Sequence, residues 1–88
     1  MRDSITIIGL HGHPASKEAD DKVRFWFERN TMVSVQKVTV KTNGDMKRAK
    51  KEYKFSDLPC LVNDGARYYG EGIDAEIRRL RDKWSHLK

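Results

Sequence analysis

Few side chains of this chain could do chemistry, and most of them lie in one loop and one strand. Cys60 is the single cysteine, so no disulfide can form within the chain, as is typical of a reducing compartment. His11, His13 and Ser16 lie around Pro14 in one short loop. Thiol–disulfide exchange proceeds through a mixed disulfide and needs an attacking sulfur atom, which imidazole and hydroxyl groups lack. A two-cysteine redox cycle is therefore excluded.

Cys60 has two possible roles. A reactive thiol would need to be a thiolate, stabilised by a helix N-terminus or by a nearby cation such as His13. However, Cys60 follows Pro59 in an apolar stretch, and a cysteine in such a stretch is more often a small buried hydrophobic residue. We expect a buried thiol and no catalytic residue, with the reactive thiol as the alternative.

His11 and His13 are two residues apart and could bind a metal ion with Cys60 as a third ligand. The alternative is that both are solvated loop side chains, or that His13 caps the following helix. A His-x-His pair without further ligands is common by chance. We therefore predict no metal site.

A predicted helix over residues 46–53 is rich in basic side chains. These could contact phosphate groups, in which case binding would weaken steeply with salt. No aromatic residue lies among them to stack on bases, and Met46, Ala49 and Tyr53 would form the buried face opposite them. A solvated face is the favoured interpretation. The basic residues are Lys47, Arg48, Lys50, Lys51 and Lys54.

The remaining elements follow from hydrophobic spacing. Residues 4–10 are apolar on both faces, which predicts a central strand. A helix follows from Pro14 to Arg29, ending at Asn30, and a second strand spans residues 33–40. Its valines change phase, which predicts a bulge or burial on both faces. The inner face of the first helix is predicted to comprise Ala19, Val23, Trp26 and Phe27.

Three further signals complete the order of elements. Thr42 to Asp45 fits a capping box better than a hairpin turn. Pro59 is expected at the first residue of a strand, and a three-residue loop at 63–65 would close a hairpin, with Gly65 in the left-handed conformation. The last helix buries Ile73, Ile77, Leu80 and Trp84.

Length and composition predict one domain over residues 1–88. The chain is 38% hydrophobic and carries a formal charge of +5, which suits a water-soluble protein. No apolar run approaches the roughly 20 residues that span a bilayer, and the N-terminus has no signal-peptide pattern. We expect a cytoplasmic protein without a membrane partner.

The order strand, helix, strand, helix, strand, strand, helix, with a proline opening the third strand, resembles the glutaredoxin branch of the thioredoxin fold. The resemblance covers nearly the whole chain. Leu58-Pro59 stands where the family has Val-Pro with a cis proline, and residues 70–74 have the Gly-x-x-x-Asp spacing found where its last helix starts. The family's Cys-Pro-x-Cys is His13-Pro14-Ala15-Ser16 here, which keeps the proline and lacks both sulfurs.

The resemblance implies an α/β fold of the thioredoxin/glutaredoxin type, βαβαββα, with a four-stranded mixed sheet flanked by helices. It also implies a groove in which an extended peptide pairs with the backbone of Leu58 as an added strand. The groove is expected to comprise His13, Pro14, Ser16, Leu58, Pro59, Gly70 and Asp74.

Relatives use this groove to hold glutathione or a substrate protein. Helix N-terminal amides near Ala15 and Ser16 would favour an anion. However, Leu10 lies near the position of a family lysine, and Glu71 replaces the second glycine of the usual pair and would repel a carboxylate. Asp74 could still receive an ammonium group. Glutathione is therefore possible but not expected, and we predict no cofactor.

The sequence therefore predicts a monomeric, glutaredoxin-like protein with a degenerate redox centre. Its expected role is non-catalytic binding or regulation of a peptide or protein through the groove next to Pro59. One alternative is a glutaredoxin-type oxidoreductase or glutathione-binding protein that uses Cys60. Another is a nucleic-acid-associated module that acts through the basic second helix.

Overall fold

The computed structural model of the chain describes residues 3–27 and 33–85, with side chains as far as Lys83. Its elements confirm the predicted order, although Asn30 and the side chain of Trp84 lie outside the described part. They are β1 (Asp3–Leu10), α1 (Pro14–Phe27), β2 (Val33–Val40), α2 (Asn43–Tyr53), β3 (Cys60–Asn63), β4 (Ala66–Tyr69) and α3 (Glu71–Ser85).

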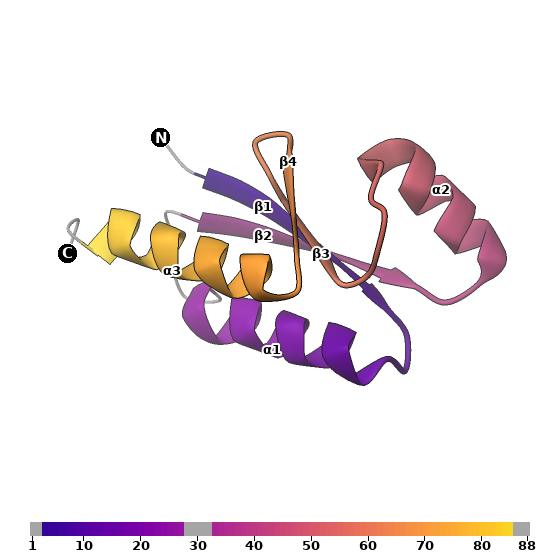
Figure 1. The fold of residues 1–88 in the computed structure, drawn as a ribbon, viewed down its shortest axis with the longest axis horizontal. Helices are drawn as coiled ribbons and strands as arrows, with labels where there is room; N and C mark the ends of the chain where they lie inside the picture. The colour runs from indigo at the N-terminus through magenta and orange to yellow at the C-terminus, as the bar shows by residue number, and fades with distance from the viewer. Residues whose placement is uncertain (1–2, 28–32, 86–88) are drawn as a thin grey trace.

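The four strands form one mixed sheet in the order β2-β1-β3-β4. β1 pairs with β2 in parallel, and β3 lies antiparallel to both β1 and β4. The sheet twists strongly, so that the hairpin of β3 and β4 runs at a steep angle to β1 in this view (Figure 1). β1 is thus a central strand, as its apolar character on both faces predicts.

Helices cover the two faces of the sheet unequally. α1 and α3 lie side by side on one face, and α2 lies apart from them near the other end of the molecule (Figure 1). The larger core cluster lies under α1 and α3 and comprises Ile5, Ile7, Ala19, Val23, Phe27, Val33, Leu61, Ile73, Ile77 and Leu80. The cluster on the α2 face comprises Ile8, Val40, Ala49, Phe55 and Cys60.

The change of phase in β2 comes from burial on both faces. Val33 and Val35 pack with the α1–α3 cluster, whereas Val38 and Val40 pack with the α2 cluster. The pairing with β1 runs without interruption from Asp3↔Val33 to Leu10↔Val40, so β2 contains no bulge. Because successive side chains of a strand point to opposite faces of the sheet, the odd-numbered and even-numbered valines of β2 pack in different core clusters.

The prediction that Trp26 is buried is wrong. Ala19, Val23 and Phe27 form the buried stripe at four-residue spacing, whereas the Trp26 residue is 42% exposed. Trp26 makes an edge-to-face contact with the exposed Phe25, and their ring centroids are 5.1 Å apart. A stripe at i, i+4 and i+8 faces the sheet directly, which leaves position 26 on the flank of the helix.

The β3–β4 hairpin has a two-residue turn, so the prediction of a three-residue loop is wrong. Asn63 pairs with Ala66 in the ladder, and Asp64 and Gly65 both have positive φ, 51° and 80°. A two-residue turn in which both residues have a left-handed backbone conformation matches the twist of the flanking strands. The dipeptide Asp-Gly favours this turn. Pro59 directly precedes β3, and its peptide bond with Leu58 is cis.

The predicted capping box of α2 is confirmed, and so are the predicted buried positions of α3 that the structure describes. The Thr42 hydroxyl accepts from the Asp45 N–H at 3.1 Å, and the Asp45 carboxylate accepts from the Thr42 N–H at 3.2 Å. Ile73, Ile77 and Leu80 are buried beneath α3. Among the described residues, no helix combines the length and the apolar character needed to cross a membrane.

Candidate functional site

The start of α1 is held tightly against the end of β1. The Leu10 N–H donates to Ser16 Oγ at 3.0 Å, and the His13 N–H donates to the Leu10 carbonyl at 3.1 Å. Gly9 permits this approach, because a Cβ at that position would lie only 3.0 Å from Ser16 Cβ. Ser16, which is 4% exposed, therefore links helix to strand.

Ser16 also contacts His13, with Oγ 2.9 Å from the Nδ1 atom of the ring. The Ser16 hydroxyl has one proton and two acceptor sites, so besides accepting from Leu10 it can donate to Nδ1 in one imidazole tautomer or accept from it in the other. A hydroxyl beside an imidazole can act as a nucleophile with its base. Here the hydroxyl is buried and engaged with the backbone, so the pair has a structural role. The His13 carbonyl accepts from the Lys17 N–H at 3.0 Å, as expected where a helix begins.

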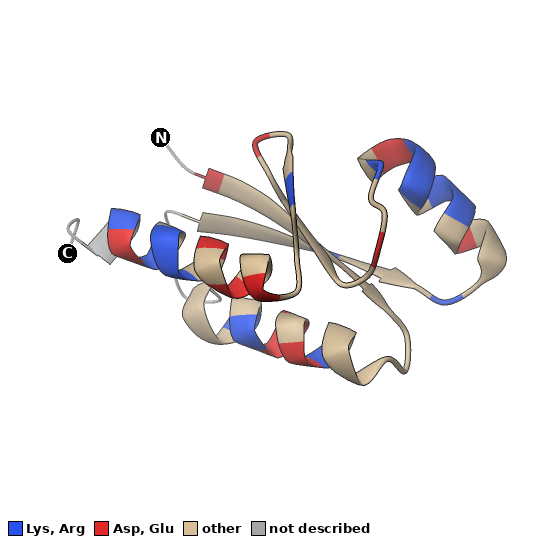
Figure 2. Cartoon of the chain, viewed as in Figure 1, with Lys and Arg blue, Asp and Glu red and all other residues tan. Residues whose placement is uncertain are grey.

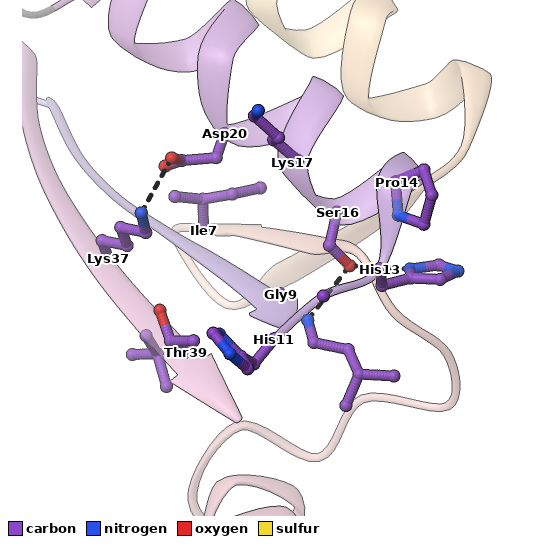
Figure 3. A pocket seen from close by; sticks show the side chains of 13 residues that line it. Ile7, Gly9, His11, His13, Pro14, Ser16, Lys17, Asp20, Lys37 and Thr39 are labelled. Atoms are coloured by element: carbon purple, nitrogen blue, oxygen red, sulfur yellow. Dashed lines mark hydrogen bonds and ion pairs between the residues drawn. The ribbon is translucent and has the colours of Figure 1, made fainter. Parts of the chain in front are cut away.

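The residues predicted to form one groove lie on two sides of α1. His13, Pro14 and Ser16 line a cavity of about 450 Å³ between α1 and β2, shown in Figure 3. We call it the β2 cavity. Pro59, Gly70 and Asp74 line a second cavity of about 280 Å³ between α1 and α3, which we call the Pro59 cavity.

Leu58, the remaining predicted groove residue, is half-buried, and its side chain packs with the core cluster on the α2 face. Its contribution to a groove is therefore limited to its backbone. The Leu58 N–H donates to Asp57 Oδ1 at 2.8 Å, so this donor, which was expected to be open to a peptide, already has a partner. Asp57 is exposed, and an incoming peptide carbonyl could replace it.

The Pro59 cavity has an apolar floor and an acidic rim. Ala15, Ala19, Pro59 and Ile73 supply the apolar surface, and the charged lining residues are Glu18, Lys22, Glu71 and Asp74. Lys22 Nζ lies 3.0 Å from Asp74 Oδ1, so one carboxylate is neutralised and two remain in excess. This charge opposes a glutathione carboxylate and favours a cation.

Gly70 and Asp74 also have local structural roles. Gly70 has a φ of 51°, and its carbonyl accepts from the Ile73 N–H at 3.1 Å as α3 begins. The carboxylate of Asp74 is held by Lys22, so it is not an open receptor for an ammonium group. A cationic ligand would instead meet Glu18 and Glu71, both of which are exposed.

Cys60 is buried, as expected, with no exposed surface. Burial raises the pKa of its thiol above the ordinary value, in spite of a hydrogen bond with Tyr69 and the charge of Arg67, which act in the opposite direction. Its side chain packs in the α2 cluster, on the face of the sheet opposite α1. Within the described ranges, no group of three His, Cys, Asp or Glu side chains could hold a metal ion, so His11, His13 and Cys60 do not form a site.

The five basic residues of the second helix form an exposed surface, as expected, and Figure 2 shows their blue segments along α2. Met46, Ala49 and Tyr53 pack inward on the opposite side. Arg48 is paired with Asp45 at 2.6 Å in the first turn. The exposed face of α2 is therefore charged, but its basic side chains line neither of the two cavities described above.

Sequence reasoning missed a buried polar cluster that positions α3. Glu76 is 3% exposed; its Oε2 accepts from Asn63 Nδ2 at 2.7 Å and from Arg79 Nη2 at 2.8 Å. These contacts join α3 to the end of β3 and so hold one wall of the Pro59 cavity. The hydrogen bond from Arg79 holds the pKa of Glu76 below its ordinary value, despite the opposing effect of burial. The spacing of Glu76 and Arg79, three residues apart on one helix, was the available signal.

In comparisons with known proteins, no family model matches the chain, and no curated protein matches it either.

Proposed function

We propose that this chain is a redox-inactive, glutaredoxin-like module that binds an extended peptide at the Pro59 cavity. The observation that carries the proposal is the cavity itself, in which an apolar floor and an acidic rim lie beside Pro59. The strand order β2-β1-β3-β4 and the succession βαβαββα support a fold of the thioredoxin type.

The absence of accessible sulfur supports binding rather than catalysis. The two positions at the start of α1 where the resembled family has cysteines hold His13 and Ser16, and disulfide exchange needs a thiolate at the point of attack. The one thiol, on Cys60, has no exposed surface, and burial raises its pKa. A thiol of this kind reacts slowly.

The chemistry of the rim indicates the class of peptide. Glu18 and Glu71 are not neutralised by Lys22, whose partner is Asp74. A basic side chain placed over Pro59 would gain from both carboxylates, whereas an acidic side chain would be repelled. The backbone of Leu58 would pair with the peptide once Asp57 releases its N–H.

Two matched peptides test the proposal. They are acetylated and amidated pentapeptides, Thr-Val-X-Val-Thr, in which X is arginine or glutamate. Binding is followed through the backbone amide shifts of the ¹⁵N-labelled protein. The arginine peptide should shift Gly70, Glu71 and the first turn of α1, and should bind about tenfold more tightly than the glutamate peptide, because one attraction becomes a repulsion.

Charge-reversal variants locate the site. Glu71→Lys should weaken the arginine peptide about fivefold, while Glu52→Lys makes the same change on the exposed face of α2 and should have no effect. Asp57→Ala should strengthen binding, because it frees the Leu58 N–H. Equal binding of the two peptides, or equal effects of the two glutamate variants, would contradict the proposal.

A further inference from the structure

The β2 cavity is the larger of the two cavities described above, and the peptide proposal does not use it. Its volume of about 450 Å³ lies within the range of sites that hold small organic molecules, roughly 300–1,000 Å³. Ile7, Leu10 and Pro14 supply apolar lining, and Thr39 and His11 lie at the β2 side (Figure 3). Such a cavity suits a molecule with an apolar body and few polar groups.

Asp20 provides the polar feature of the wall. Its Oδ2 lies 2.9 Å from Lys37 Nζ, and its side chain is only 13% exposed. Its other oxygen, Oδ1, is buried and has no hydrogen-bond partner in the described part of the chain. A buried acceptor without a donor is destabilising, and the described part of the chain supplies no donor to this oxygen.

The charges of the lining narrow the choice of ligand. Lys17 and Lys37 face a single carboxylate, Asp20, so the cavity has one positive charge in excess when its histidines are neutral. This excess disfavours an amine cation. The uncompensated oxygen of Asp20 disfavours a carboxylate at the same position. A neutral O–H or N–H group satisfies Oδ1 without either repulsion.

We propose that the β2 cavity binds a small, neutral, largely apolar molecule that carries one strong O–H or N–H donor, as a phenol does. The donor bonds to the carboxylate of Asp20, which lines the cavity, and the apolar body lies against Ile7. Because Oδ1 has almost no accessible surface in this structure, Asp20 must turn this oxygen toward the cavity for the donor to reach it. This binding is independent of the peptide site on the α3 side of α1.

The experiment uses p-cresol and toluene, which differ by one hydroxyl group. Each is titrated into the ¹⁵N-labelled chain, and amide shifts are recorded. We expect p-cresol to give saturable shifts at Gly9, Gly12 and Thr39, which line the cavity. Toluene should bind about 10- to 100-fold more weakly, since it lacks a hydrogen bond to a charged acceptor.

Asp20→Asn tests the acceptor directly. The amide should turn its oxygen to Lys37 and its NH₂ to the cavity, so that p-cresol binding falls about 10- to 100-fold. Asp21→Asn is the matched control, because it makes the same change at an exposed neighbour and should leave binding unchanged. Thr39→Trp, at an exposed position of β2, should block the cavity, and it tests the proposal even if Asp20→Asn does not fold.

The proposal would be overturned by equal affinity for p-cresol and toluene or by unchanged p-cresol binding in Thr39→Trp. It would also be overturned by p-cresol shifts confined to Phe25 and Trp26 or to the Pro59 cavity. A cavity that holds only water would show no saturable shift, and that result would overturn it as well. None of these outcomes depends on whether the arginine peptide binds.

Discussion

The two sides of α1 differ in nearly every property that governs binding. On the α3 side, the Pro59 cavity is smaller, its rim is acidic, and the backbone of Leu58 lies close by. On the β2 side, the cavity is larger and mostly apolar, and two lysines face one aspartate. A single helix thus separates a surface suited to a basic peptide from a hollow suited to a small neutral molecule.

The helical period produces this division. Ser16, Lys17 and Asp20 lie along the side of α1 that faces β2, whereas Ala15, Glu18, Ala19 and Lys22 lie along the side that faces α3. Steps of three or four residues return to the same side of a helix, so Asp20 lies with Ser16 and Lys17. Neighbours in the first turn of a helix can nevertheless belong to different sites, as Ala15 and Ser16 do.

The largest change, in thiol–disulfide reactivity, is expected when two cysteines are introduced at the start of α1. The side chains of His13 and Ser16 meet at 2.9 Å, and residues three apart at a helix start have a spacing that a disulfide can span. His13→Cys combined with Ser16→Cys should form an internal disulfide and exchange with glutathione disulfide, which the unchanged protein should not do. Thiol titration and exchange kinetics measure this.

The matched control for that variant is His11→Cys combined with Ser16→Cys, a pair for which the structure gives no side-chain contact. It should form the internal disulfide far less readily. If both double variants formed disulfides equally well, the start of α1 would not have the defined geometry described above.

The next largest effect is expected at the link between α1 and β1. Ser16→Ala removes the acceptor of the Leu10 N–H and should lower the free energy of unfolding by about 1–3 kcal/mol. Ser34→Ala, at an exposed position of β2, should change it by less than about 0.5 kcal/mol. Urea denaturation compares the two variants, and equal values would show that Ser16 does not hold the helix.

The α3 side should be sensitive to acid. Because the folded-state pKa of Glu76 is lowered from its ordinary value of 4.5, its ionisation stabilises the fold above that value. This contribution is lost as the pH falls through the lower, folded-state pKa. Glu76→Gln, which keeps an oxygen for Asn63, should be less stable than the unchanged protein at pH 7 and should lose less stability on acidification.

Urea titrations at pH 7 and at pH 3 test this prediction. Arg79→Gln should reproduce part of the effect, because Arg79 is the main cause of the lowered pKa of Glu76. Parallel losses of stability in the unchanged protein and in Glu76→Gln would mean that other carboxylates account for acid sensitivity.

The smallest effect is expected on α2, which is charged and lines neither of the two cavities described above. Lys50→Glu reverses a charge on its exposed face and should alter the free energy of unfolding by less than about 0.5 kcal/mol. Filter binding at low salt should retain no DNA or RNA with either form. Salt-dependent retention that Lys50→Glu removes would restore the nucleic-acid interpretation of this face.

Much of the fold could be predicted because local rules agree with it. The capping box at Thr42 and the apolar spacing of Ile73, Ile77 and Leu80 act within one element and need no tertiary information. The loop predicted at 63–65 is one residue too long, because Asn63 belongs to the ladder, where it pairs with Ala66 and its side chain bonds to Glu76. That contact joins two elements and leaves no periodic signal in the sequence.

The site was less predictable for the same reason. The family resemblance implied a groove that includes Pro59, Gly70 and Asp74, which do line one cavity, but it could not show that His13 and Ser16 line another. Nor could it show that Asp57 bonds to the Leu58 N–H or that one oxygen of Asp20 is buried without a donor. These features depend on which side of a helix faces which strand.

The interpretation rests on binding at α1 without disulfide chemistry. The direct test is to incubate the folded protein with glutathione disulfide near neutral pH and to measure its intact mass by mass spectrometry. We predict that the mass of the folded protein stays unchanged, while Cys60 acquires glutathione once denaturant exposes it. Rapid formation of a glutathione adduct on the folded protein would contradict the interpretation.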